Sequence, residues 1–122
     1  MHYLNKNIGN YGENLAEAYL KKCGYTILDK NYYCKIGEID LIGMDTNIIC
    51  FIEVKTRYST FYGYPSEAII KKKQYKIYRT AQLYIIKNKL FEQNFRFDVV
   101  EILLDVNSKE PSIKLLKNAF YV

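Results

Sequence analysis

The feature that most constrains the fold is a pair of closely spaced apolar runs, each as long as a β-strand. Residues 37–42 form the first run and residues 48–57 form the second. The residues between them, 44–47, are mostly polar and of the kind that closes a β-hairpin. The sequence therefore predicts a hairpin of two neighbouring strands over residues 37–57.

Charged residues interrupt both apolar runs. Asp40 lies in the first run, and Glu53 and Lys55 lie in the second. Side chains alternate between the two faces of a strand, so Glu53 and Lys55 point to the same face. If the two strands pair, Asp40 can lie beside Glu53, which would bring two carboxylates and one ammonium together at the rim of a sheet.

These residue types suit a site for a hard metal ion. Mg²⁺ and Mn²⁺ prefer oxygen ligands and are commonly held by one or two carboxylates, water and a substrate phosphate. A nearby lysine can hold the attacking water or offset charge on the transferring phosphate. The alternative is a surface ion pair between Glu53 and Lys55, with Asp40 in a turn. The apolar surroundings favour the metal site, because an unpaired charge is costly there.

Size and composition narrow the class of protein. The chain has 122 residues, the size of one domain, and its formal net charge is +5. The charge fits a polyanionic partner, but the excess of lysine over arginine is also what compositional bias produces. The three cysteines include no C-x-x-C pair, and no apolar run reaches membrane-spanning length. We therefore expect a single cytoplasmic domain over residues 1–122, with no membrane partner.

Patterns in the rest of the chain predict two helices and three further strands. After an irregular lead-in over residues 1–9, the predicted elements are a helix over 10–23, a strand over 25–28, a connection over 29–36, the hairpin, a helix over 65–88, and strands over 96–104 and 112–116. The second helix suits a crossover that makes the flanking strands parallel. This order predicts an α/β fold with a mixed sheet.

The second predicted helix carries a run of basic residues in its first half. Lys72, Lys73 and Lys76 belong to this run, which forms either a solvated face or a face that contacts phosphates. Gln74 and Tyr78 lie one helical turn apart, at a spacing that would let both face the carboxylates.

Three charged residues elsewhere each have a candidate role. Glu13 lies in the predicted first turn of the first helix, where it either complements the helix dipole or adds a metal ligand. Arg57 is a candidate phosphate contact at the end of the second hairpin strand. Arg96 either contacts phosphate or forms a structural ion pair with Asp98.

The ordered set of motifs resembles the UPF0102 (YraN-like) family. The matching segments include residues 12–13, 37–42, 51–57, 67–68, 73–74 and 96–99, and they run in family order from about residue 12 to residue 100. This family is placed in the PD-(D/E)xK nuclease superfamily and is similar to archaeal Holliday-junction resolvases. The resemblance implies a restriction-endonuclease-like α/β core, in which a mixed central sheet of about five strands is flanked by helices.

The resemblance also implies roles for individual residues. Asp40 and Glu53 match the two metal ligands, with Mg²⁺ or Mn²⁺ as the cofactor, and Lys55 matches the lysine that orients or activates the hydrolytic water. Glu13 matches a helix glutamate that many resolvase-like members add to the site. Gln74 falls where some nuclease branches carry a glutamine. Ile39 stands where the superfamily's name would place a proline before the aspartate.

Three hypotheses for function follow. The first is a metal-dependent phosphodiesterase that cuts DNA, with branched or structured DNA as a candidate substrate. The second is a nucleic-acid-binding module that uses the same fold without cutting, and the third is an interaction protein with an acidic partner. A homodimer is a further expectation from the resemblance, because resolvase-like enzymes act on two strands as pairs. The residues expected to contact nucleic acid are Arg57, Lys72, Lys73, Gln74, Lys76 and Arg96.

Overall fold

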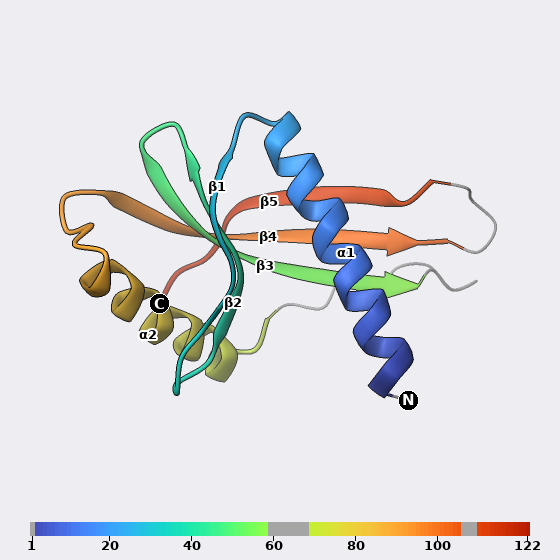
Figure 1. Ribbon diagram of the computed structural model, residues 1–122, viewed down its shortest axis with the longest axis horizontal. Helices are drawn as coiled ribbons and strands as arrows, with labels where there is room; N and C mark the ends of the chain where they lie inside the picture. The colour runs from blue at the N-terminus through green and yellow to red at the C-terminus, as the bar shows by residue number, and fades with distance from the viewer. Residues whose placement is uncertain (1, 59–68, 106–109) are drawn as a thin grey trace.

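In the part of the chain that it describes, the computed structural model is an α/β structure with one five-stranded mixed sheet and two helices (Figure 1). It describes residues 2–58, 69–105 and 110–122, with side chains from residue 9 onward. The elements are α1 His2–Lys22, β1 Thr26–Tyr33, β2 Glu38–Asp45, β3 Ile48–Tyr58, α2 Lys71–Lys87, β4 Asn94–Leu104 and β5 Ser112–Phe120. The strands are ordered β1-β2-β3-β4-β5. The predicted α/β class, with a restriction-endonuclease-like core, is confirmed.

Strand pairing agrees with the predicted hairpin and crossover. β2 and β3 pair antiparallel, from Asp45↔Ile48 next to the turn to Leu41↔Ile52. β3 and β4 pair in parallel along the whole of β3, and α2 connects them. The other neighbouring pairs, β1 with β2 and β4 with β5, are antiparallel.

The two helices pack on opposite faces of the sheet, because the central strands are apolar on both faces. On the α1 face, Leu20 of the helix packs with Ile52 of β3 and other buried residues. On the α2 face, Ile77 packs with Phe51 and Phe97. Figure 1 shows α1 crossing in front of β3, β4 and β5, while β1 and β2 twist strongly away from them. The central part of the hairpin therefore lies between two apolar layers, and two of its charged residues, Asp40 and Glu53, are buried there.

Several predicted boundaries were wrong. α1 begins at His2, so the predicted irregular lead-in is helical. β1 continues to Tyr33 because residues 29–33, predicted as a connection, pair with β2. α2 begins at Lys71, after an extended Ile70, and the prediction for 65–68 lies outside the described residues. β5 continues to Phe120, beyond the predicted end. In β1 and β5, backbone pairing with a neighbouring strand outweighs a polar local sequence.

Neither of the described helices is both long enough and apolar enough to span a bilayer.

A close approach between α1 and β3 depends on Gly12. A Cβ atom added to Gly12 would overlap Oγ1 of Thr56. It would also lie 3.0 Å from the Thr56 Cβ and 3.2 Å from the Thr56 Cγ2. We expect Gly12→Ala to lower the free energy of unfolding by about 1–3 kcal/mol, the usual cost of overpacking a contact that cannot open. Chemical denaturation followed by circular dichroism measures this change.

Gly9 is the matched control for this prediction. It lies in the same helix, and a Cβ atom added to it meets no heavy atom within 4 Å. Gly9→Ala should therefore stabilise the protein by about 0.5–1 kcal/mol, because alanine favours the helix. Equal effects of the two substitutions would contradict the importance of the Gly12 contact.

Candidate functional site

The candidate site begins where β2 and β3 stop pairing. The last pair of their ladder is Leu41↔Ile52. Beyond it, Oδ2 of Asp40 accepts a hydrogen bond of 2.8 Å from the backbone N–H of Val54. The Asp40 side chain thus satisfies a backbone donor of β3 at the point where the strands diverge. It is held there rather than pointing freely into solvent, and only 9% of the residue is exposed.

Glu53 lies next to Asp40, as the hairpin pattern predicted. Its residue is 8% exposed. Burial and then the negative charge of Glu53 raise the pKa of Asp40 to about 8, although the Val54 N–H opposes the shift. Burial and the neighbouring carboxylate therefore disfavour a second negative charge at this pair, and a bound cation would relieve that repulsion.

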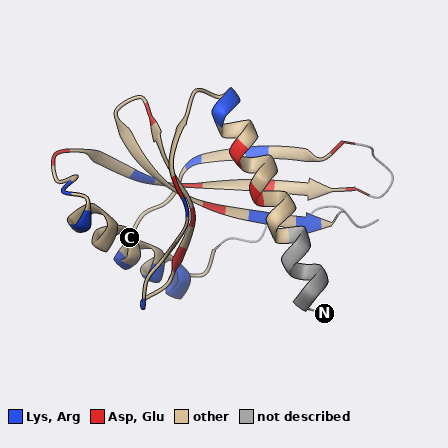
Figure 2. Cartoon of the chain, in the orientation of Figure 1, with Lys and Arg blue, Asp and Glu red and all other residues tan. Residues whose placement is uncertain are grey.

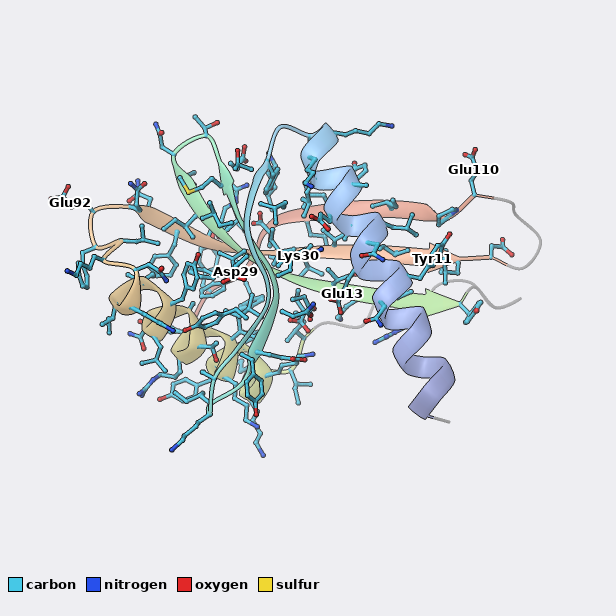
Figure 3. All side chains as sticks on the ribbon, viewed as in Figure 1. Tyr11, Glu13, Asp29, Lys30, Glu92 and Glu110 are labelled. Atoms are coloured by element: carbon cyan, nitrogen blue, oxygen red, sulfur yellow. The ribbon has the colours of Figure 1, made fainter. Side chains whose placement is uncertain are left out.

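Glu13 lies on α1 (Figure 3) and is close enough to Glu53 and Glu38 to feel their charges. Burial raises the pKa of Glu13, and the charges of Glu38 and Glu53 raise it further. A hydrogen bond from the Asn31 side chain and the charge of Lys30 act in the opposite direction. Glu13 is therefore part of the acidic cluster. The prediction that it lies in the first turn of the helix was wrong, because α1 begins at His2.

Lys73 of α2 contacts one member of the acidic pair, Glu53, directly. Its Nζ lies 2.7 Å from Oε1 of Glu53. Burial lowers the pKa of Lys73, but the hydrogen bond and charge of Glu53, with the charges of Asp40 and Glu38, outweigh this effect and raise it. Figure 2 shows this arrangement as acidic positions near the centre of the view and basic positions along α2. Lys73 was predicted only as a nucleic-acid contact, and its ion pair with Glu53 was missed.

Lys55 follows Glu53 on the same face of β3. It pairs with Glu101 of β4 in the parallel ladder, so the two side chains share a face. Glu101 is 5% exposed. The alternation along β4 indicates that Glu101 is buried, because Phe97, Val99 and Glu101 lie two residues apart and share a face.

Arg96 has the structural role that the sequence left as one of two alternatives. Its Nε lies 2.9 Å from Oδ1 of Asp98, and its Nη2 lies 2.6 Å from Oδ2 of Asp45. The Nη2 group also donates to the hydroxyl of Tyr25 at 2.8 Å, and that hydroxyl donates to Asp98. The ion pair with Asp98 is confirmed. Only 14% of the Arg96 side chain is exposed, and its guanidinium already binds Asp45, Asp98 and Tyr25, so a phosphate contact by Arg96 stays a prediction.

The remaining predicted residues lie in different environments. Nε2 of Gln74 donates to the carbonyl of Ile69 at 2.8 Å, so its side chain turns back on the preceding backbone. Tyr78 packs against the apolar core on the α2 face, with its ring centroid 6.3 Å from that of Phe97. The prediction that Tyr78 faces the carboxylates was wrong. The three other predicted contacts are exposed: Arg57, Lys72 and Lys76.

The donor set at this site fits one hard divalent cation. Asp40 and Glu53 supply carboxylate oxygens from adjacent strands, and Mg²⁺ needs only one or two carboxylates besides water and phosphate. Within residues 9–58, 69–105 and 110–122, no group of three acidic, histidine or cysteine side chains has the geometry of a metal site. Glu13 as a third direct ligand therefore stays a prediction.

Comparisons with known proteins cover the whole of this region. A family model described as "Uncharacterised protein family UPF0102" matches residues 12–102. A "UPF0102 protein" of Clostridium botulinum (strain Kyoto / Type A2) is 58% identical over 123 residues, covering all of both chains. A "UPF0102 protein" of Clostridium kluyveri is 52% identical over 122 residues, again covering all of both chains. The matched range contains the β2–β3 hairpin and α2.

Proposed function

The chain belongs to the UPF0102 family, and from this premise and the geometry of the hairpin we propose that it is a metal-dependent phosphodiesterase that cuts DNA. One observation carries the proposal. Two largely buried carboxylates, Asp40 and Glu53, lie side by side with a lysine two residues further along the same strand. Such a cluster is costly to folding and is typical of functional sites.

Each side chain has a separate task in the proposed reaction. Asp40 and Glu53 would hold the cation, which would supply a lower pKa for its bound water and offset charge on the phosphate. Lys55 orients the attacking water on the face that it shares with Glu53. The hydrogen bond from the Val54 N–H holds the Asp40 carboxylate in place and would pre-orient it as a ligand. The exposed Lys72, together with Lys76 and Arg57, attracts the DNA backbone and positions it without reading its sequence.

The experiment is a cleavage assay on labelled DNA of several shapes. Linear duplex, single strand, flap and four-way junction are incubated with Mg²⁺ or Mn²⁺ and either the wild type or Asp40→Ala. We expect metal-dependent cutting by the wild type and a loss of at least about a hundredfold in Asp40→Ala. The preferred DNA shape identifies the substrate class, and preference for a junction would support a homodimer that cuts two strands.

Identical purification of both proteins excludes a contaminating nuclease. Equal cutting by Asp40→Ala and the wild type would contradict the assignment of the site. Binding without cutting by either protein would instead favour a non-catalytic nucleic-acid-binding module, whose affinity should fall steeply with salt because phosphate contacts release counterions.

A further inference from the structure

The first turn of α2 has a composition that opposes helix formation. Its first three residues are all lysines, and it contains no acidic residue. Ile70 occupies the N-cap position without a side-chain hydrogen bond to the helix. A cation near the positive end of a helix dipole is unfavourable. Something outside the helix must therefore favour positive charge at this position.

The ion pair between Lys73 and Glu53 identifies that external partner. The side chain of Lys73 is 54% exposed, whereas that of Glu53 is only 10% exposed. Lys73 thus reaches from the surface to a largely buried carboxylate, with its Nζ 2.7 Å from Oε1. Asp40 and Glu38 attract the same ammonium. Lys71 and Lys72 are exposed in the same turn, and the contact with Glu53 is made by Lys73.

We propose that Lys73 is a positioning residue that supplies the positive charge of the site when no metal is bound and withdraws when the metal enters. The inference rests on the proposed function, because it takes Glu53 as a metal ligand. An ammonium and a divalent cation repel each other strongly at a few ångströms. Both cannot contact the same Glu53 carboxylate at full strength, so metal binding and the Lys73 ion pair compete.

Displacement gives Lys73 a second partner. Once released from Glu53, its ammonium lies at the edge of the site with the adjacent exposed lysines of α2, where a DNA phosphate would arrive. Binding of the metal would then create a phosphate contact that is absent without it. Because linkage is reciprocal, DNA should strengthen metal binding by the same factor that metal strengthens DNA binding.

The test is isothermal titration of Mn²⁺ into the full-length protein, without DNA, at low salt. We expect Lys73→Met to bind Mn²⁺ about three- to tenfold more tightly than the wild type, because the competing charge is gone. Lys71→Met removes the same charge two residues away and should change affinity less than twofold. Lys73→Arg keeps a cation at the site and should bind as the wild type does. Circular dichroism establishes that each variant is folded.

The outcomes separate this inference from the proposed function. Equal or weaker Mn²⁺ binding by Lys73→Met, with clear binding by the wild type, would overturn the role of Lys73 and leave the metal site standing. Equal gains in Lys73→Met and Lys71→Met would also overturn it, because the effect would then come from net charge. Absence of Mn²⁺ binding by all four proteins would overturn both the inference and the metal-dependent function.

Discussion

Asp40→Asn is expected to melt at a higher temperature than the wild type at pH 8 in metal-free buffer. Burial and the neighbouring Glu53 carboxylate raise the pKa of Asp40 to about 8. The wild type must therefore bury an unfavourable charge at this pH, whereas asparagine is neutral and can still accept the hydrogen bond from the Val54 N–H. We expect a gain of about 2 kcal/mol, or roughly 5 °C or more in Tm.

The pH dependence of this gain has a defined sign. An unfolded aspartate has a pKa of about 3.9, so between about pH 4 and pH 8 folded Asp40 binds its proton more tightly than the unfolded chain does. The stabilisation from the protonated form is fully present below pH 4 and is lost as the pH rises through about 8. The two proteins should therefore differ least near pH 4 and most at pH 8 and above.

Metal binding should reverse the order of stability. Mg²⁺ or Mn²⁺ stabilises only the folded protein that holds it, so the Tm of the wild type should rise with metal concentration. Asp40→Asn lacks one of the two carboxylates and should respond much less. Thermal melts with and without metal measure both effects. A wild type that is insensitive to metal, or an Asp40→Asn that responds equally, would contradict Asp40 as a ligand.

Asp45→Asn is the matched control on the same strand. Asp45 accepts hydrogen bonds from Arg96 and Lys117, and these bonds lower its pKa. Its charge therefore stabilises the fold above the unfolded pKa, and that contribution is lost as the pH falls. The same chemical change should lower the Tm at pH 8, by the equivalent of about 1 kcal/mol. Stabilisation by both substitutions would indicate a general effect of lost negative charge.

Lys55→Gln is expected to reduce DNA cleavage by about 10²–10⁴-fold while leaving metal binding intact. This loss of rate is the size expected when an enzyme loses one positioned side chain that assists proton transfer from the attacking water. Lys55 follows the ligand Glu53 on the same face of β3 and is not itself a ligand, so the metal-induced rise in Tm should persist. Single-turnover cleavage at saturating metal measures the chemical step, and fluorescence anisotropy measures DNA affinity, which should change only a few-fold.

Lys114→Gln is the matched control for this substitution. Lys114 lies on β5, opposite Glu101 in the antiparallel ladder, and it is exposed. The substitution Lys114→Gln removes the same charge from the same sheet without changing the hairpin, so the rate of cleavage should stay within about twofold of wild type. Cleavage by Lys55→Gln within the same range would remove Lys55 from the reaction.

The hairpin could be predicted in detail because its signals are local. The alternation of side chains and the polar turn specify which residues share a face, and these two facts bring Asp40 beside Glu53. The parallel pairing of β3 with β4 followed from the helix between them. The end of β1 could not be predicted in this way, because residues 29–33 become a strand only by pairing with β2.

The contact partners of each charged residue were harder to predict than the strand or helix on which it lies. Arg96 and Asp98 are two residues apart, so their ion pair was a recognised alternative. Their further contacts with Asp45 and Tyr25 join residues more than 50 positions apart in the chain. No local pattern indicates such a network. The same reason explains why Lys73 was interpreted as a surface cation and not as a partner of Glu53.

The sequence by itself determined the class of the fold, the presence of the central hairpin and the residue types of the candidate site. These features depend on periodicity and on neighbours within one hairpin, which local rules describe. The tertiary structure alone decided that α1 and α2 approach the hairpin from opposite faces and bring Glu13 and Lys73 to its acidic pair. The physical reason is that burial and long-range charge, which raise the pKa of Asp40 and hold Lys73 at Glu53, exist only after distant elements have packed together.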